Sequence, residues 1–587
     1  MERNPLALAD QAFDLVVIGG GIFGICAAWE AVARGFSVAL IEQADFAGQT
    51  SANSYKIVHG GIRYLQHADL VRLRRSCAQR STLLRLAPHL VQPLPIVVPT
   101  FGHGLKGKAV LGAGMLLYDL LTIDCNRGIR DPERRIPWTR FLSAAEVRRI
   151  FPGLPSRDLT GAAVFNDAQM YNPPRLALSF LRAAVDAGAV AANYVQATGF
   201  LRTNDRIVGV RAEDRLSGER FEIRARAVLN AAGPWAEGLL RQALDLPLRR
   251  SCSYSRDVCF VLRERRAERY GLAVPGATRD PDALISRAAR HLFIVPWRDY
   301  SLVGVWHAVR TPGPHATRVT ADELQAFIAE INASYPALGL ELDDVTLCCA
   351  GLVPFGENAP GAADLSYGKR SILIDHAVDH GVDGLVTLIG IRYTMAVGDA
   401  AKAIDLIAAK LARHAPRPSA EPPPVFGGRI EDFEALVRTA ERQIGGALPA
   451  RAVRALVHHY GDEYGRILNY AKSDQSLLQT VGTTTVVQAE ITHAVREEMA
   501  VQLGDVVFRR TDLATGQPPN EADLATCARL MAAELGWSPA RTEAEMAAVR
   551  HTLAEMMPHV AQRQETSPPL VAASGCGGPG ASGMSPA

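Results

Sequence analysis

The sequence has almost no net charge, and this excludes one class of partner. It carries 63 basic and 61 acidic side chains over 587 residues, for a formal charge of +2. A nucleic-acid-binding protein needs a basic patch or stripe. The arginine clusters at 72–75 and 127–135 are too short to form one, so we interpret both as solvated helix or loop faces and expect no nucleic-acid partner.

Paired cysteines are also missing. The nine cysteines include no C-x-x-C pair, and the adjacent Cys348 and Cys349 could bridge each other only through a strained ring. We therefore predict free thiols in a reducing compartment and assign no metal ligands. Residues 1–12 contain acids and no apolar run, so we see neither a secretory signal nor a myristoylation site and expect a cytoplasmic protein.

The apolar stretch Ala109–Ile123 is too short to cross a membrane. It contains Asp119, and a hydrocarbon core of about 30 Å requires roughly 20 apolar residues. We interpret this stretch as a buried core helix. The alternative is a helix that lies on a membrane surface through one apolar face.

What the sequence does contain separates into regions of different texture. Hydrophobic residues make up 48% and charged residues 21%, the balance of a soluble globular protein long enough for two or three domains. From 12 to 413, short apolar runs typical of strands alternate with helical patterns, which predicts an α/β body around a largely parallel sheet. The proline-rich segment 414–424 predicts a stiff linker, and 425–562 has helical spacing almost throughout. The tail 563–587 is dominated by Ser, Pro, Gly and Ala, so we expect it to be disordered.

A glycine-rich turn near the start indicates dinucleotide binding. A buried strand at 14–18 runs into Gly19, Gly21 and Gly24, and an alanine-rich helix and a second strand follow. These glycines permit a tight turn, the approach of the backbone to a pyrophosphate, and close packing of helix on sheet. Glu42 ends the second strand, where a carboxylate can accept hydrogen bonds from ribose hydroxyls. Because strand, turn, helix, strand and acid all agree, we prefer this interpretation to an incidental glycine-rich turn.

Two later segments help to choose between FAD and NAD, which share this fingerprint. One is the return strand at 228–235, which contains Asn230 and Gly233, and the other is Gly390 after a strand at 385–389. Both resemble elements of the glutathione-reductase-type FAD fold, which implies FAD as the cofactor.

The same resemblance implies the fold class. We expect an α/β protein with a Rossmann-like, glutathione-reductase-type FAD-binding domain, an α+β substrate domain and a helical C-terminal domain. The substrate domain is expected as an insertion at roughly 88–165 and 245–345.

A long segment after the second strand carries a more specific resemblance. Residues 45–51 (DFAGQTS) and 54–65 (SYKIVHGGIRYL) are very similar to a segment of the FAD-dependent glycerol-3-phosphate dehydrogenases. The similarity continues through 86–90, 293–297 and 489–510, and it covers nearly the whole chain apart from the tail. It implies that the flavin takes a hydride from C2 of sn-glycerol 3-phosphate, giving dihydroxyacetone phosphate. The electrons then pass to membrane quinone or, in the oxidases of the family, to oxygen.

The matched positions imply the residues of the site. His59 lies in the flavin-side loop and is our candidate for accepting the alcohol proton, because an imidazole titrates near working pH. Arg63 and Tyr64 match residues beside the substrate, where a guanidinium can hold phosphate through two hydrogen bonds. The alternative is that His59 and Tyr64 are buried, hydrogen-bonded residues beneath the flavin. The predicted catalytic set is His59, Arg63, Tyr64, Arg392 and Thr394. The predicted cofactor-binding set is Gly19, Gly21, Gly24, Glu42, Thr50, Ser51, Ser54, Lys56, Asn230, Gly233 and Gly390.

Several departures from the family pattern fall at the substrate end. Val353 stands where the family has an arginine, and Arg392 replaces a lysine. The family's G-T-T-D ends here in His307, and of its paired acids only Asp167 remains. A lost charged contact to phosphate costs a few kcal/mol, unless Arg392, Arg290 or His307 compensates.

Three functions remain open on this evidence. The first is an FAD-linked dehydrogenase of glycerol 3-phosphate or a related hydroxylated phosphate, with a quinone acceptor at the inner face of the cytoplasmic membrane. The second is an FAD oxidase of another alcohol, a hydroxy acid or an amine. The third is a non-catalytic flavoprotein, which the cations retained around the expected flavin disfavour. A peripheral membrane contact and a homodimer accompany the first hypothesis.

Overall fold

The computed structural model describes most of the chain. The described residues are 1–102, 108–155, 157–246, 253–265, 269–279, 289–310, 316–355, 370–411 and 424–560. The predicted tail at 563–587 and the predicted linker at 414–424, apart from Pro424, lie outside them.

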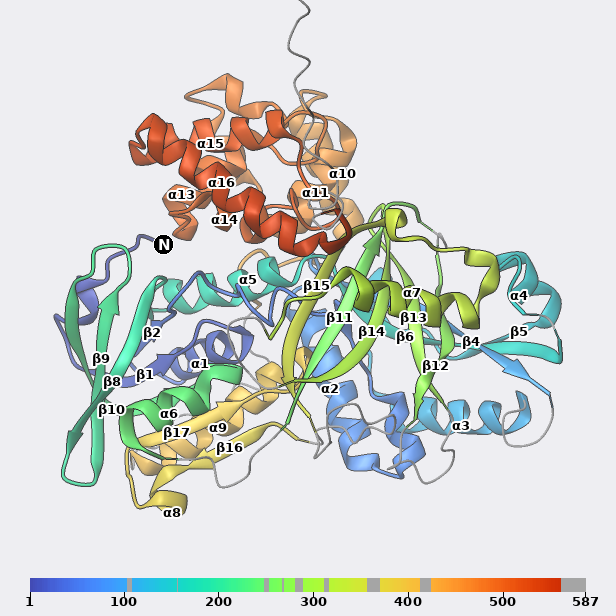
Figure 1. Cartoon of the computed structure of the whole chain (residues 1–587), viewed down its shortest axis with the longest axis horizontal. Coiled ribbons are helices and arrows are strands. Elements are labelled where there is room, and N and C mark those ends of the chain that lie inside the picture. The colour runs from blue at the N-terminus through green and yellow to red at the C-terminus, as the bar shows by residue number, and fades with distance from the viewer. Residues whose placement is uncertain are drawn as a thin grey trace, which may run out of the picture.

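The first of two sheets has a parallel centre built around the glycine turn (Figure 1). Its strands are ordered β16-β17-β10-β1-β2-β7, and all of these pairs are parallel except β16 with β17. β8 and β9 extend β10 as an antiparallel ribbon. The bounds are β1 (Phe13–Ile18), β2 (Val38–Ile41), β7 (Val190–Ala192), β8 (Val195–Thr203), β9 (Arg206–Asp214), β10 (Arg220–Asn230), β16 (Ile372–Asp375) and β17 (Leu385–Ile389). β1 is apolar over nearly its full length because both faces of a parallel sheet are covered.

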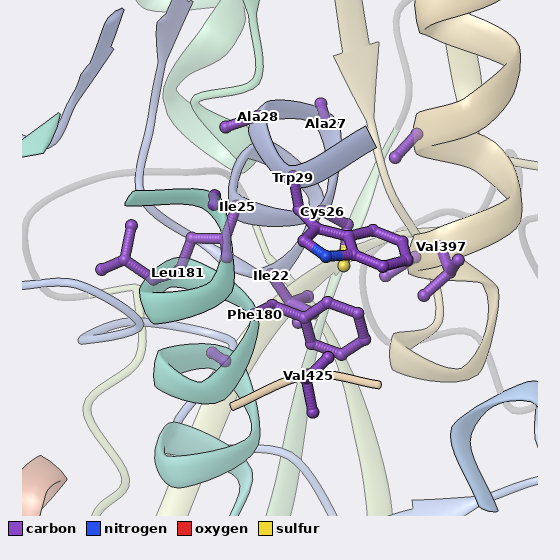
Figure 2. Packing of buried hydrophobic residues seen from close by; sticks show 14 of the residues in the cluster. Ile22, Ile25, Cys26, Ala27, Ala28, Trp29, Phe180, Leu181, Val397 and Val425 are labelled. Carbon is purple, nitrogen blue, oxygen red and sulfur yellow. The ribbon is translucent and has the colours of Figure 1, made fainter. Parts of the chain in front are cut away.

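Helices α1 (Ile22–Ala33), α5 (Pro173–Asp186) and α9 (Ala396–Lys410) cover one face of this sheet. Alanines on α1 let the neighbouring helices approach closely, and the Trp29 indole packs edge-on against the Phe180 ring with centroids 5.2 Å apart (Figure 2). This apolar packing fixes the start of α1, and with it the glycine turn, against the ends of the central strands.

The second sheet is mostly antiparallel. Its order is β15-β11-β14-β13-β12-β4-β6-β3, with β5 on β6, and β12 with β4 is the parallel pair. The bounds are β3 (Ile57–Val58), β4 (Val91–Phe101), β5 (Arg140–Ser143), β6 (Leu159–Met170), β11 (Tyr254–Leu262), β12 (Gly271–Arg279), β13 (Ala289–Trp297), β14 (Tyr300–Arg310) and β15 (Val345–Pro354). The prediction of one largely parallel sheet was therefore wrong for this half of the body, whereas an antiparallel sheet agrees with the expected α+β substrate domain. Short apolar runs mark strands equally well in both kinds of sheet, so they did not distinguish the pairing.

The remaining helices flank the body or form the C-terminal group at the top of Figure 1. Those on the body are α2 (Leu70–Leu86), α3 (Lys108–Leu121), α4 (Ala144–Ile150), α6 (Ala236–Leu244), α7 (Ala321–Ser334) and α8 (His376–His380). The C-terminal group is α10 (Phe433–Ile444), α11 (Ala450–Tyr460), α12 (Gly465–Tyr470), α13 (Gln488–Glu498), α14 (Leu503–Asp505), α15 (Glu521–Leu535) and α16 (Pro539–Met556), with a π-helical turn η10 (Val506–Arg510).

The interpretation of 109–123 as a buried core helix was wrong. Helix α3 buries Met115 and Tyr118, but Leu116, Leu117 and Leu120 are 54%, 48% and 61% exposed. The helix carries apolar side chains on both its buried and its exposed sides, and only the buried side finds partners in the fold. No helix among the described residues is both long and apolar enough to cross a membrane.

A smaller correction concerns the second arginine cluster. Arg134 is buried rather than solvated, its Nε donates to the Pro88 carbonyl oxygen at 2.6 Å, and its guanidinium lies over the Phe433 ring. An arginine can be buried where its planar group stacks on an aromatic ring and its donors meet carbonyl oxygens.

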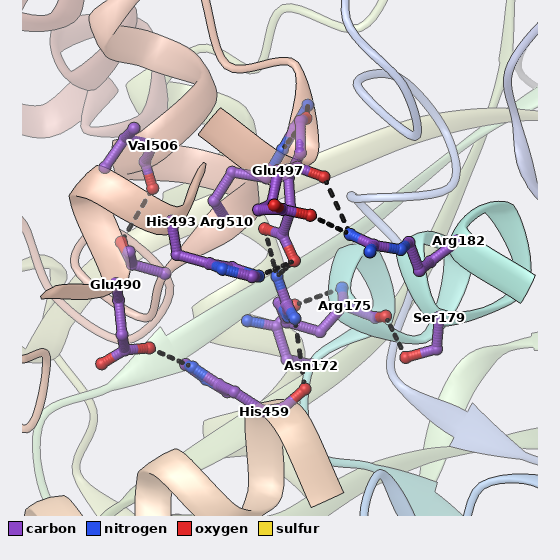
Figure 3. Close-up of polar contacts among 12 residues, drawn as sticks. Asn172, Arg175, Ser179, Arg182, His459, Glu490, His493, Glu497, Val506 and Arg510 are labelled. Carbon is purple, nitrogen blue, oxygen red and sulfur yellow. Dashed lines mark hydrogen bonds and ion pairs between the residues drawn. The ribbon is translucent and has the colours of Figure 1, made fainter. Parts of the chain in front are cut away.

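Buried ion pairs join the C-terminal helices to the body. Arg510 donates through two nitrogens to the Asp45 carboxylate at 2.6 and 2.7 Å, and Arg509 contacts the same carboxylate. Arg175 on α5 pairs with Glu498 at the end of α13 at 2.6 Å (Figure 3). Because a buried charge without a partner costs several kcal/mol, these pairs fix how the two parts sit together.

His459 on α11 lies between two carboxylates in the same interface, and Figure 3 shows one of them, Glu490. Its Nδ1 is 3.0 Å from Glu490, and its Nε2 is 2.9 Å from Asp512, which also pairs with Arg298. Burial alone lowers the pKa of an imidazole, but Asp512 and Glu490 raise the pKa of His459 to about 9. The imidazole is therefore a buried cation at neutral pH.

This cation should make stability depend on pH. Because folding raises the pKa of His459 from 6.5 to about 9, its contribution is fully present below pH 6.5 and is lost as the pH rises to about 9. The contribution is on the order of 3 kcal/mol. In thermal unfolding series at pH 6–9.5, the stability difference between wild type and His459→Gln should shrink with rising pH.

His493→Gln is the matched control. His493 lies in the same interface, but burial lowers the pKa of its imidazole to about 4. Its contribution is lost only as the pH falls, so the difference from wild type should stay flat above pH 6.5. A flat difference for His459→Gln as well would contradict the assignment of a buried imidazolium.

Candidate functional site

One large cavity lies between the two sheets, with a volume of about 490 Å³. Residues from the glycine turn, from the loop after β2, from β11 and β15, and from the segment after β17 line it. Of the predicted site residues, those that line it are Gly19, Gly21, Glu42, Thr50, Ser51, Ser54, His59, Gly233, Gly390, Arg392 and Thr394.

The glycine turn has the geometry that its sequence suggested. Gly19 has φ +106°, and a Cβ on it would lie 2.6 Å from the Ala231 carbonyl oxygen. A Cβ on Gly24 would lie 1.9 Å from the Gly19 carbonyl oxygen, so the missing side chain lets α1 pack against the turn. Gly24 is not among the residues that line the cavity. The N-terminus of α1, capped by Gly21 without a side-chain bond, opens on the cavity with its positive dipole end.

Glu42 stands at the end of β2, where the ribose is expected. The N–H groups of Gly20 and Ala44 donate to its carboxylate at 2.7 and 2.9 Å. Burial raises the pKa of Glu42, and these two hydrogen bonds act in the opposite direction. The acid is therefore held against the turn and faces the cavity at one end of the cofactor path.

The loop 45–54 crosses from the first sheet to the second. Ser51 Oγ accepts from the Ile22 N–H at 3.0 Å, at the start of α1. The Thr50 hydroxyl donates to the Leu352 carbonyl oxygen on β15 at 3.0 Å. These bonds hold the loop across the cavity wall, so it can contact both halves of an extended ligand.

The opposite wall comes from β10 and β17. Asn230 is buried behind the wall, where its side chain donates to the Ala236 carbonyl oxygen and accepts from the Ala232 N–H, which shapes the turn at Gly233. A Cβ on Gly390 would lie 2.0 Å from the Phe23 ring. With Glu42 at one end and Gly390 at the other, the cavity fits an extended dinucleotide such as FAD.

His59 is oriented by a buried carboxylate. Its Nδ1 lies 3.0 Å from Asp167, and 45% of its side chain is exposed. Burial acts to raise the pKa of Asp167, but the bond from His59 and the charge of Arg80 lower it overall, so the carboxylate is ionised. Nδ1 therefore donates to Asp167, and Nε2 is left as a proton acceptor. The role of Asp167 was missed, and its only sequence signal was the altered pair of acids.

Arginines gather around Tyr64 beside this pair. The guanidinium carbons of Arg392 and Arg72 each lie 5.1 Å from the centre of the Tyr64 ring. Burial lowers the pKa of Arg392, and the charges of Arg72 and Arg63 lower it further. Within the part of the chain that the structure describes, no carboxylate forms an ion pair with Arg392. Such a cluster of like charges favours an anionic ligand.

An acid lines the cavity where the chain departs from the family pattern, and a histidine lies beside it. Asp257 on β11 lines the cavity, lies 2.7 Å from His307 Nδ1 on β14, and accepts from the Ser255 hydroxyl at 2.6 Å. Gly351 is opposite Asp257 on β15, and Val353 lies two residues further along. The contact between Asp257 and His307 follows from the register of β11 with β14, which was not predicted from the sequence. Arg290 is buried and lies outside the lining of the cavity.

Lys56 lies outside the main cavity. It is buried beside a second cavity of about 110 Å³, and its Nζ lies 4.7 Å from the centre of the Trp297 ring. The exposed Arg63 and the buried Tyr64 belong to the 3-10 turn η2 (Ile62–His67) next to the main cavity.

Flavin binding should depend on the missing side chain at Gly24. In Gly24→Ala, the new methyl group would overlap the Gly19 carbonyl oxygen, so the turn must shift and bound flavin should be lost. The measurement is the ratio of visible flavin absorbance to protein in the purified variant. Gly114→Ala is the control, because a Cβ at this helical glycine meets nothing within 4 Å and alanine favours helix by up to about 1 kcal/mol. Full flavin content in Gly24→Ala would exclude this turn as the pyrophosphate site.

Two families match the chain in succession. Residues 14–396 match the family described as FAD dependent oxidoreductase, and residues 420–542 match the C-terminal domain of alpha-glycerophosphate oxidase. The first match alone spans more than half of the chain.

Individual relatives agree with this assignment. The glycerol-3-phosphate dehydrogenase of Synechocystis sp. is 31% identical over 87% of this chain and 91% of its own length. The mitochondrial glycerol-3-phosphate dehydrogenase of Bos taurus is 30% identical over 94% of this chain and 75% of its own. The glycerol-3-phosphate dehydrogenase from Bacillus halodurans, solved in complex with FAD, has the same fold, with a TM-score of 0.72 at 23% identity over 94% of this chain and 97% of that one.

These matches confirm the predicted fold class and the predicted cofactor. The FAD-binding body and the helical C-terminal domain each have their counterpart in a known family. The chain belongs to the FAD-dependent oxidoreductases and, among them, to the family of the glycerol-3-phosphate dehydrogenases.

Proposed function

We propose that the protein oxidises sn-glycerol 3-phosphate, or a closely related hydroxylated phosphate, to dihydroxyacetone phosphate and passes the electrons to a quinone. The observation that carries the proposal is the position of Arg392. This cation lines the cofactor cavity together with His59 and Thr394, and it lies over Tyr64 without a carboxylate partner among the described residues. A cation of this kind beside a proton acceptor suits a substrate with a phosphate at one end and an alcohol next to it.

The side chains divide the chemistry among them. Arg392 and Arg63 hold the phosphate, because a guanidinium offers paired donors in one plane. His59 Nε2 accepts the proton of the C2 hydroxyl, and ionised Asp167 stabilises the imidazolium that forms. FAD, when bound, supplies the hydride acceptor at N5. The Thr394 hydroxyl accepts from the His59 N–H at 3.0 Å and so keeps the histidine backbone in place.

The rebuilt sheet supports a second candidate, an FAD oxidase of another alcohol, a hydroxy acid or an amine. Asp257 places a carboxylate at this end of the cavity. The same end lacks the arginine of the family pattern, because position 353 is valine. A carboxylate binds hydroxyl or ammonium groups and repels phosphate. In the first candidate, Arg392 selects the substrate by binding its phosphate. In the second, Asp257 selects it by binding a hydroxyl or ammonium group.

An anaerobic titration separates the two candidates. Glycerol 3-phosphate should bleach the visible flavin band of the purified holoprotein, and glycerol should leave it unchanged because it lacks the anion. Arg392→Met should retain flavin but raise the half-bleaching concentration by about 10- to 100-fold, the value of one charge-assisted hydrogen bond.

Arg74→Met is the control for this titration. Arg74 lies on α2 near Arg72 but pairs with Asp124 at 2.5 Å, so its loss should leave the titration unchanged. If neither compound bleaches a flavin-loaded wild type, the glycerol 3-phosphate proposal fails, and hydroxy acids and amines become the substrates to test.

The quinone proposal requires a contact with a membrane, and helix α3 supports one. Leu116, Leu117 and Leu120 on α3 are exposed, as is Ile123 just beyond it. Trp138 is also exposed, and its neighbour Thr139 donates from its backbone N–H to Asp119 on α3 at 2.9 Å. An exposed apolar face on a short helix is typical of proteins that rest on a bilayer without crossing it. We propose that this face enters the lipid and gives access to quinone.

Two charges on this face should release the protein from lipid. Leu117→Asp with Leu120→Asp should lower partitioning onto phospholipid vesicles by on the order of 100-fold, because each leucine contributes roughly 1.5–3 kcal/mol when buried. The measurement is cosedimentation with vesicles, with flavin content as the check on folding. Val378→Asp is the control, since this side chain is 78% exposed on α8 at the opposite end of the body (Figure 1). Equal loss in both variants, or none in either, would argue against α3 as the contact.

A further inference from the structure

Two cysteines face each other across neighbouring strands beneath the cofactor cavity. Cys259 on β11 is directly opposite Cys349 on β15 in an antiparallel pair. Directly opposite residues have Cα atoms about 4.5–5.5 Å apart, within the range of roughly 4.4–6.8 Å that a disulfide spans. Both are free thiols here, and both belong to the same buried cluster.

The neighbouring Cys348 has a different environment. It points to the other face of β15 and packs in a separate apolar cluster with Val258 and Phe260. Burial raises the pKa of its thiol, which keeps it protonated and unreactive. The chain thus provides an internal comparison, with adjacent cysteines on opposite faces of one strand.

The Cys259–Cys349 pair has a cation beside it. Lys56, buried over the Trp297 ring, acts on both sulfurs through its positive charge. The neighbouring Cys259 thiol and the charge of Lys56 lower the pKa of Cys349, against the effect of burial. The neighbouring Cys349 and burial raise the pKa of Cys259. One thiol is therefore set to ionise while its partner keeps its proton, the arrangement of a nucleophile next to a resolving thiol.

Each cysteine also lines a cavity. Cys259 lines the cofactor cavity, and Cys349 lines the second cavity of about 110 Å³ together with Lys56 and Arg509. In the proposal that follows, the second cavity is the route by which a small neutral oxidant reaches Cys349. Hydrogen peroxide has the right size, and it is the product whenever dioxygen takes two electrons from a reduced flavin.

We propose that Cys259 and Cys349 form a two-electron redox site that reduces hydrogen peroxide and closes as a disulfide between β11 and β15. The Cys349 thiolate attacks one peroxide oxygen and breaks the O–O bond, which gives a sulfenic acid and, with the proton that the thiol released, one water. The Cys259 thiol then attacks that sulfur, the S–S bond forms, and the hydroxyl leaves with the thiol proton as a second water. Two thiols lose two electrons, and one peroxide becomes two waters.

The disulfide would join the two strands that carry the substrate end of the cavity. Asp257 lies two residues before Cys259, and Gly351 and Val353 lie two and four residues after Cys349. Oxidation would therefore tie the two strands of this wall together, and it would remove the hydrogen bond that the Cys259 thiol donates to the Ser54 carbonyl oxygen at 3.9 Å.

Peptide mapping of the flavin-loaded protein tests the proposal. After hydrogen peroxide treatment and alkylation, wild type should lose two free thiols and yield one cross-linked peptide containing Cys259 and Cys349, lighter by two hydrogens and reversed by dithiothreitol. Cys349→Ser should abolish the cross-link, and Cys348→Ser should keep it. Lys56→Met should slow the loss of thiols by on the order of tenfold, because the thiolate fraction falls.

Flavin content reports whether each variant folds. If Cys349→Ser purifies without flavin, the variant Cys259→Ala is used in its place. Peroxide treatment of Cys259→Ala should leave Cys349 as a sulfenic acid that a dimedone probe captures. Recovery of both thiols in alkylated form after peroxide treatment of wild type would overturn the proposal. Oxidation of Cys348 in place of this pair would overturn it equally. The peroxide is added as a reagent, so the result does not depend on which substrate the enzyme oxidises.

Discussion

The buried carboxylate of Asp45 is the constraint on which the rest of the structure depends. It accepts hydrogen bonds from Arg510, Arg509 and Asn193, and these donors offset the cost of burying its charge. The two arginines belong to the C-terminal helices, whereas Asp45 begins the loop 45–54 that lines the cofactor cavity. One anion thus joins the helical part of the chain to the loop that contacts both sheets. This junction is one of the contacts that fix the loop along the cavity wall, beside those of Ser51 and Thr50.

The cavity lies where two sheets of different construction meet, and this separates its two tasks. The parallel sheet supplies the glycine turn, Glu42 and Gly390, which are backbone and packing features of the cofactor site. The antiparallel sheet supplies Asp257 and the wall near Val353, where the chain departs from the family pattern. Because the two sets lie on different strands, the substrate end can change without disturbing the strands that hold the dinucleotide. His59 and Arg392 line the same cavity, and the proposed reaction brings the alcohol to the cofactor beside them.

Part of the fold could be predicted because its signals are local. The turn after β1 depends on three glycines within six residues, and the strand before Gly390 was placed at 385–389, as observed. The wrong predictions concern contacts between segments that are far apart in the sequence. The stretch 109–123 is apolar enough for a core, but only its contacts decide which side is covered, and Leu116, Leu117 and Leu120 remain exposed. Strand pairing in the second sheet failed for the same reason, since apolar runs do not specify the direction of a neighbour.

The sequence by itself determined the dinucleotide unit, the helical C-terminal part and the family, because these depend on residues that are contiguous along the chain. Only the tertiary structure decided which distant side chains meet. His59 finds Asp167, Asp45 finds Arg510, and Cys259 finds Cys349, each across roughly 90 residues or more. The physical reason is that strand register and helix docking are set by the packing of the whole core. The residue pattern of one segment does not specify which distant segment packs against it.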